Sequence, residues 1–299
     1  MPYLLLFLSL VLLYLGAELT LNGAENIGRY FKLSSLAIGV ILIGFGTSLP
    51  ELFVSQIASY QKIYDVALAN IMGSNIFNLL VILGIVALIQ KIPVVDIKQQ
   101  IIFQFLATVL GFLTIYFKVN LISGFILLLL FGYYLSKTLT SESEPDDDET
   151  EFKFKYVVKF FLGIFSLYYG GNLLVNSAVQ ISELLQIESR VFSAIVVAAG
   201  TSLPELFTAL ITVVKKKHLN LVLGNVLGSN MFNILFILGS LGVYNFSSSY
   251  KYYLEFGALI IGYLILVYAA RKKELARIGA IPMVALYLGV VYYLLNVSA

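Results

Sequence analysis

The stretch Gly46-Thr47-Ser48-Leu49-Pro50-Glu51 returns unchanged as Gly200-Thr201-Ser202-Leu203-Pro204-Glu205, 154 positions later. A second motif follows each copy: Asn70, Gly73, Ser74, Asn75, Phe77 and Asn78 return, 155 positions later, as Asn225, Gly228, Ser229, Asn230, Phe232 and Asn233. Upstream of the hexapeptides, Tyr14, Gly16 and Asn22 match Tyr168, Gly170 and Asn176. The chain therefore consists of two related halves.

The amino-acid composition indicates whether these two halves lie in water or in a lipid bilayer. The 299 residues are 60% hydrophobic and 12% charged, with a mean hydropathy of +0.92. Soluble domains average about a quarter charged residues, so a water-soluble fold is excluded. Apolar segments close to the length of about 20 residues that spans a bilayer recur along the whole chain. We expect ten spans, at residues 3–21, 35–59, 66–89, 99–117, 120–136, 156–179, 190–213, 220–243, 252–270 and 278–296.

Each half holds five spans, and this odd number makes the second half enter the membrane from the opposite side. Inverted-topology repeats of this kind are typical of transporters. The predicted fold class is an all-α membrane protein with ten transmembrane helices in two inverted-topology repeats of five, at residues 1–136 and 156–299. Residues 137–155 form a linker with a block of acidic side chains. We interpret the linker as a solvated tether, with a regulatory Ca2+ contact as the alternative.

Basic residues are unevenly divided between the two sides of the membrane. If the spans alternate, one side receives fifteen of the nineteen Lys and Arg residues, and the other receives Lys62, Lys118, Arg190 and Lys251. The positive-inside rule makes the first side cytoplasmic. We therefore expect a multi-pass protein of the cell membrane with both termini outside and the central linker inside. The first span lacks the basic n-region of a signal peptide, so it is kept as a true span.

Several kinds of chemistry are excluded. The chain has no cysteine, so it forms no disulfide and no thiolate site. Its one histidine, His218, follows Lys215–Lys217 in a predicted cytoplasmic loop, where a solvated side chain is the favoured interpretation. No HExxH motif or comparable nucleophile–base pair is present. We therefore expect no enzyme, no cofactor and no nucleic-acid partner, and a monomer in the lipid bilayer.

Acidic residues within the predicted spans point to a function, because a carboxylate in hydrocarbon costs several kcal/mol or more. Glu51 and Glu205 occupy matched positions in the two halves. Glu18 has Asn172 as its counterpart, so we rank it below the matched pair, as a satisfied polar residue or a secondary gate or proton site. The matched pair is the candidate cation site.

The proline before each matched glutamate weakens the helix that carries it. A proline leaves the carbonyl four residues earlier without its N–H partner, and here these are the carbonyls of Gly46 and Gly200. Broken backbone at membrane depth is tolerated where it lines a site, and its carbonyls can bind cations. The alternative is an ordinary proline kink, which identical copies in both halves disfavour. Hydroxyl oxygens are added by Thr47, Ser48, Thr201 and Ser202.

A polar stripe follows in each half. Asn70, Ser74 and Asn78 are spaced four residues apart, as are Asn225, Ser229 and Asn233, so each set lies on one helical face. We expect both faces to point at the broken helices and to bind ions or support the site. Asn75 and Asn230 lie off the stripe, where interhelical hydrogen bonding is the simpler role.

These groups together offer carboxylate, carbonyl, hydroxyl and amide oxygens. Hard cations prefer such ligands, and Ca2+ accepts six to eight oxygens in a flexible geometry. Two ionised glutamates are neutralised by one Ca2+ or by a set of monovalent ions, so competition for the same oxygens produces exchange. The glycines of the first and sixth spans suit sliding contacts that would expose the site to either side. A proton-coupled antiporter and a passive cation channel remain as alternatives.

At these motifs the sequence resembles the calcium/cation antiporter superfamily, in particular the prokaryotic type of its sodium/calcium exchanger family. The resemblance covers both halves and implies ten spans with four central ion sites, at which Na+ and Ca2+ are exchanged by alternating access. It implies Ca2+ ligands at Glu51 and Glu205, with the carbonyls of Thr47 and Thr201. Further positions carried over from the family are the Na+ ligands Ser48, Ser74, Ser202 and Ser229, backbone groups of Gly44 and Ala198, and the middle-site residues Asn78 and Asn233.

One position departs from the family pattern. Some members carry aspartate where this chain has Asn233, so the middle site here has one fewer carboxylate. Stoichiometry and any K+ requirement therefore stay open. The cation/proton exchangers of the superfamily use a different motif, which places H+ coupling second to Na+ coupling.

Overall fold

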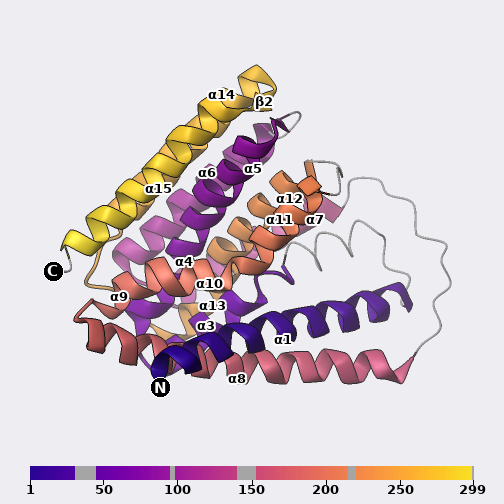
Figure 1. The fold of residues 1–299 in the computed structure, drawn as a ribbon, viewed down its shortest axis with the longest axis vertical. Coiled ribbons are helices and arrows are strands. Elements are labelled where there is room, and N and C mark those ends of the chain that lie inside the picture. The colour runs from indigo at the N-terminus through magenta and orange to yellow at the C-terminus, as the bar shows by residue number, and fades with distance from the viewer. Residues whose placement is uncertain (31–44, 95–97, 140–152, 215–219, 298–299) are drawn as a thin grey trace.

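The computed structural model describes residues 1–30, 45–94, 98–139, 153–214 and 220–297, and within them nearly all of the chain is helical (Figure 1). Some sequence predictions lie outside these residues. They are the first part of the predicted second span, most of the linker, Lys215–Lys217, His218 and Gly44.

The described helices agree closely with the predicted spans. Seven helical runs are long and apolar enough to cross a membrane, and a bent helix pair would make an eighth; one shorter apolar helix covers residues 121–137. The unbroken helices are α1 (Pro2–Tyr30), α6 (Lys98–Phe117), α7 (Leu121–Leu139), α8 (Phe154–Leu185), α14 (Tyr253–Lys272) and α15 (Arg277–Val297). The largest difference from the predicted bounds is at α1 and α8, which extend well beyond residues 21 and 179. The protein is thus a multi-pass helical membrane protein.

The second hexapeptide lies where a helix is interrupted, and the first lies where a helix begins. In the second half, α9 (Ser189–Phe192), a π-helical segment η3 (Ser193–Val197) and α10 (Ala198–Thr201) run into α11 (Leu203–Val214) through a bend of 42°. In the first half, a turn precedes α3 (Leu49–Tyr60). Each proline is the second residue of its helix, where a missing N–H costs little. The first helical turn therefore carries the glutamate of each motif.

The polar stripes lie on two buried helical runs. The first consists of α4 (Tyr64–Ile76), the π-helical η2 (Phe77–Ile82) and α5 (Leu83–Ile89). The second consists of α12 (Asn220–Met231), the π-helical η4 (Phe232–Ile237), α13 (Leu238–Ser240) and the 3-10 turn η5 (Leu241–Tyr244). In their most apolar stretches 89% and 83% of the residues are buried. We call these two runs the core helices.

The outer pair consists of α1 and α8, which pack against each other side by side (Figure 1). Only 28% of the most apolar stretch of each helix is buried. The two backbones approach closely at glycines: a Cβ added to Gly16 would lie 2.9 Å from the Leu167 amide nitrogen, and one added to Gly23 would lie 2.7 Å from the Tyr156 carbonyl. Small residues at such seams are typical of helix pairs in membranes.

Two short β contacts are the exception to the all-α prediction. Strands β1 (Ile92–Pro93) and β2 (Glu274–Leu275) pair antiparallel, and a single bridge joins Val119 to Phe246. Both occur in loops between helices, where the backbone needs hydrogen-bonding partners outside a helix. Each contact joins two loops that the sequence-based topology predicts on the same side of the membrane.

Candidate cation site

Glu51 and Glu205 are fully buried and lie close enough to interact electrostatically. Each lies in the first turn of its helix, α3 or α11, where the helix dipole favours a negative charge. The fold brings together two side chains that are 154 residues apart in the sequence. The structure therefore meets the central geometric expectation of the sequence, which is a converging pair of buried carboxylates.

Each motif contributes a serine that hydrogen-bonds to the glutamate of the other motif. The Ser48 hydroxyl donates to Oε1 of Glu205 at 2.9 Å, and the Ser202 hydroxyl donates to Oε1 of Glu51 at 3.0 Å. Both serines are fully buried. Each glutamate is thus held by the motif of the opposite half, and neither half can form this arrangement alone.

The two threonines extend the same cluster. Thr47 contributes hydrogen bonding to Glu205, and Thr201 does so to Glu51. The Thr201 hydroxyl also lies within hydrogen-bonding distance of Oδ1 of Asn70, at 3.3 Å, and of the Ala198 carbonyl, at 3.2 Å, and its single proton serves one acceptor at a time. Six buried side chains of the two hexapeptides therefore form one connected polar cluster.

The serines of the core helices differ from each other. Ser229 donates to Oε1 of Glu205 at 3.4 Å, whereas Ser74 makes its contacts with the Ala198 carbonyl and the Thr201 hydroxyl, both at 3.4 Å. The candidate site is therefore only approximately two-fold symmetric in this conformation.

Two asparagines of the stripes are buried with unused hydrogen-bonding capacity. Asn78 and Asn233 are fully buried at the second residue of η2 and η4, and neither their side-chain nitrogen nor their oxygen has a hydrogen-bonding partner within the described part of the chain. Single π-helical turns occur frequently at functional sites. The amide nitrogen of Asn70 instead bonds to Ser55 at 3.0 Å and to the Glu51 carbonyl at 3.4 Å. Asn75 and Asn230 make the predicted interhelical bond, from the Asn230 amide to the Asn75 carbonyl at 3.1 Å.

The second carboxylate oxygens are the strongest indication of a ligand. Oε2 of Glu51 and Oε2 of Glu205 are buried, and no hydrogen-bond donor reaches them from the residues that the structure describes. A buried carboxylate oxygen without a partner is costly, and two adjacent carboxylates repel each other when ionised. Unsatisfied carboxylate and amide oxygens at one buried place form a ligand set suited to a hard cation.

One prediction about the backbone is wrong. The Gly46 carbonyl is not left unpaired by Pro50, because it accepts the Leu49 amide at 3.4 Å, and the Gly200 carbonyl is likewise hydrogen-bonded at the end of α10. The chain closes a tighter turn at the break instead of leaving the carbonyl free. Glu18 lies on an exposed side of α1, which fits its lower rank.

The sequence analysis missed a buried ionic cluster at one end of the bundle. Arg190, assigned there to a loop, has a side chain only 6% exposed; its Nη2 lies 2.6 Å from Glu188, its Nη1 lies 3.8 Å from Glu255, and its guanidinium lies 3.5 Å above the Tyr250 ring. Burial and the nearby Glu255 raise the pKa of Tyr250 to about 12, so it stays protonated. The available signal was Glu255, an acidic residue inside the predicted ninth span.

Comparisons with known proteins agree with this geometry. The chain matches the family described as sodium/calcium exchanger protein over residues 1–139 and 155–296. It is 34% identical to a putative antiporter, CaxA, of Alkalimonas amylolytica, with 77% of each protein covered. It is 26% identical to the sodium/calcium exchanger MaX1 of Methanosarcina acetivorans over 95% of this chain and 96% of that protein. Among solved structures, the sodium-calcium exchanger NCX_Mj soaked with 10 mM Na+ and zero Ca2+ superimposes with a TM-score of 0.71 at 30% identity, covering 97% of this chain and 98% of that one.

Proposed function

This chain belongs to the sodium/calcium exchanger protein family, a family of membrane antiporters, and on that premise we propose that it exchanges Na+ for Ca2+ by alternating access. The observation that carries the proposal is the crossed pair of bonds from Ser48 to Glu205 and from Ser202 to Glu51. These bonds hold two buried carboxylates side by side while one oxygen of each is left for a cation.

In this proposal Ca2+ binds between Glu51 and Glu205. The hydroxyl and carbonyl oxygens of Thr47 and Thr201 complete its coordination, since Ca2+ accepts many neutral oxygens besides carboxylates. Na+ ions use the same carboxylates together with the hydroxyls of Ser48, Ser74, Ser202 and Ser229. The amide oxygens of Asn78 and Asn233, which have no other partner among the described residues, border the middle of the site.

Charge balance couples the two ion fluxes. With both glutamates ionised the empty site carries two negative charges, and moving it through hydrocarbon is strongly unfavourable. One Ca2+ or a set of Na+ ions neutralises the site. The loaded forms change their access and the empty form does not, so each ion species can leave only when the other replaces it.

We further propose that the fold is ten spans in two inverted repeats, residues 1–136 and 156–299, joined by a cytoplasmic linker at residues 137–155, with both termini outside the cell. The described ends of the chain lie at the same end of the bundle, opposite the β1–β2 pair (Figure 1). In this topology fifteen of the nineteen Lys and Arg residues would belong to cytoplasmic loops, the side that would also hold β1 and β2. An even number of spans and the positive-inside rule both agree with this orientation.

The decisive experiment is Na+-driven uptake of radioactive Ca2+ into proteoliposomes. Vesicles loaded with Na+ should accumulate Ca2+ when diluted into Na+-free buffer. Glu51→Gln and Glu205→Gln should each lower the uptake rate about a hundredfold or more, because each removes one of two charges that bind Ca2+. Glu274→Gln is the matched control, because Glu274 lies in the β2 loop and pairs with exposed Lys91. Unchanged uptake by either site variant would remove the proposed site.

Proton coupling is the second candidate, because protonation would also neutralise the two buried carboxylates that lack donors at Oε2. The same vesicles separate the candidates. A pH gradient imposed in the absence of Na+ should drive no Ca2+ uptake if Na+ is the coupling ion. Uptake driven by the pH gradient alone would replace Na+ by H+ in the proposal.

A further inference from the structure

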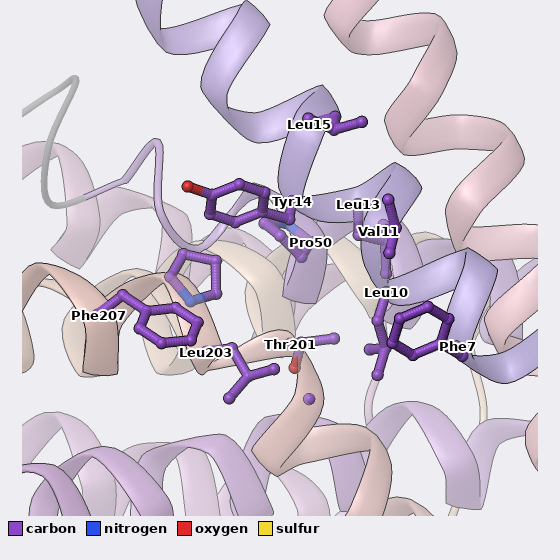
Figure 2. Close-up of a pocket in the computed structure, with 12 residues that line it drawn as sticks. Phe7, Leu10, Val11, Leu13, Tyr14, Leu15, Pro50, Thr201, Leu203 and Phe207 are labelled. Carbon is purple, nitrogen blue, oxygen red and sulfur yellow. The ribbon is translucent and has the colours of Figure 1, made fainter.

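An apolar cavity of about 220 Å³ lies between α1 and the broken helix of the second half (Figure 2). One wall is formed by side chains of α1, and the opposite wall by Leu203 and Phe207 of α11. The remaining lining residues include Pro50, Gly200, Thr201 and Pro204. The cavity therefore touches the residue directly before each of the two site glutamates.

The cavity opens toward the outside of the helical bundle. Phe7, Tyr14 and Phe207 on its rim are 62%, 46% and 49% exposed, while Thr201 at its inner end is 1% exposed. Exposed apolar rim residues merge with the apolar surface of α1 and α11. A molecule in the lipid phase can thus enter from the side.

The positions of the lining residues along their helices indicate how deep in the membrane the cavity lies. Its α1 lining runs from Phe7 to Leu15, the central part of the apolar span Pro2–Thr20. Thr201 and Leu203 lie centrally in the broken span that runs from Ser189 to Val214. Because the middle of a bilayer holds hydrocarbon and not lipid headgroups, the material available there is an acyl chain.

The cavity offers few polar groups that could bind water or ions. Thr201 directs its hydroxyl to Asn70, Ser74 and the Ala198 carbonyl, all on the side of the glutamates. Tyr14 lies on the rim and is about half exposed. Water in a cavity needs two to four polar partners, which this lining does not offer.

We propose that the cavity is a binding site for one lipid acyl chain, which enters laterally between α1 and α11 and closes the side of the carboxylate site. The acyl chain packs on Pro50, Thr201 and Pro204 and keeps bilayer water away from Glu51 and Glu205. The inference depends only on the chain spanning a membrane, so it stands or falls independently of which ions are exchanged.

The chain contains no tryptophan, which permits a direct test with single-tryptophan variants. Phe207→Trp places a fluorophore on the rim of the cavity. Phe105→Trp is the matched control, because Phe105 is an exposed phenylalanine near the middle of α6 that does not line the cavity. Both purified variants are reconstituted into phosphatidylcholine bilayers that contain a small fraction of lipid brominated near the chain end.

A retained acyl chain should quench Phe207→Trp about twofold more strongly than Phe105→Trp at the same low fraction of brominated lipid, because affinity grows with buried apolar area. Adding Val11→Phe, which fills the cavity from α1, should remove this excess and leave the control unchanged. Circular dichroism and size-exclusion elution verify that each variant is folded.

Three results would overturn the proposal. Equal quenching of both tryptophans would mean that only ordinary surrounding lipid is present. Excess quenching that survives Val11→Phe would place the acyl chain elsewhere. Quenching of Phe207→Trp by aqueous iodide would identify a water-filled path.

Discussion

The core helices and the outer pair have similar amino-acid compositions but pack in different ways. In the core, α4–η2 and α12–η4 bury polar side chains that converge on two carboxylates. In the outer pair, α1 and α8 meet along a glycine seam, and most of their surface faces outward. Close packing of the core helices fixes the positions of the two carboxylates. Close packing of α1 on α8 instead brings two glycine-lined helix surfaces into contact.

This difference indicates which part can move. Displacing a core helix would break hydrogen bonds such as those of Asn70 and Ser229. The outer pair meets the rest of the bundle mainly where α8 packs on α3, and there the Gln61 amide donates to Asn172 at 3.4 Å, a long and weak bond. Apolar contacts are not directional and survive a shift. We therefore expect core substitutions to change stability and ion binding, and outer substitutions to change the rate of the conformational step.

The largest effect is expected from Gly73→Val in the core. A Cβ at Gly73 would lie 2.7 Å from Ala198 Cβ and even closer to the Ala194 carbonyl oxygen. Overpacking against backbone should destabilise the protein by about 3 kcal/mol or more. The measurement is the thermal midpoint in detergent by size-exclusion elution. Gly224→Val on α12 is the matched control, since a Cβ there meets nothing within 4 Å. Equal midpoints for the two variants would contradict a rigid core.

A smaller effect, on rate more than on stability, is expected from Gly23→Val in the outer seam. A Cβ there would lie 2.7 Å from backbone atoms of Phe160 and Tyr156 in α8. Because α1 can shift outward, the thermal midpoint should fall less than in Gly73→Val. The rate of exchange should fall about tenfold, as expected for a disturbed conformational step. Gly132→Val on α7, with nothing within 4 Å, is the control. A normal exchange rate would argue against movement at this seam.

A negative charge introduced in the core should also have a larger effect than the same charge introduced in the outer pair. Asn233→Asp places a third carboxylate beside a site that has two, so the bound ions must supply one more positive charge to neutralise it. The Ca2+-loaded form of this variant keeps one uncompensated negative charge, so the expected result is Ca2+ uptake about tenfold slower than in the unchanged protein. Asn172→Asp makes the same substitution on α8 and should leave the uptake rate unchanged. A slower rate in Asn172→Asp, or an unchanged rate in Asn233→Asp, would break the distinction between the two regions.

The sequence predicted some features of the core helices and the outer pair and missed others, for physical reasons. Hydropathy placed the helices, because span length follows bilayer thickness, and the repeated hexapeptide placed Glu51 and Glu205 at helix starts. The crossed serine bonds join residues 157 and 151 positions apart, and no local pattern specifies which oxygen they reach. The π-helical turns at Asn78 and Asn233 also follow from packing instead of propensity. Arg190 resembled a loop residue, because its partners Tyr250 and Glu255 lie far away in the sequence.

The smallest effect should separate the two serines of the core. Ser229 reaches Oε1 of Glu205 at 3.4 Å, while Ser74 reaches Ala198 and Thr201 instead of Glu51. A single long hydrogen bond to a carboxylate is worth about 0.5–1 kcal/mol, so Ser229→Ala should weaken Ca2+ binding about threefold. Ser74→Ala should change it less, because no direct bond to a carboxylate is lost. Isothermal titration with Ca2+ in Na+-free buffer measures both values. Equal losses would mean that the Ca2+-bound core is symmetric and that Ser74 turns toward Glu51 when the ion binds.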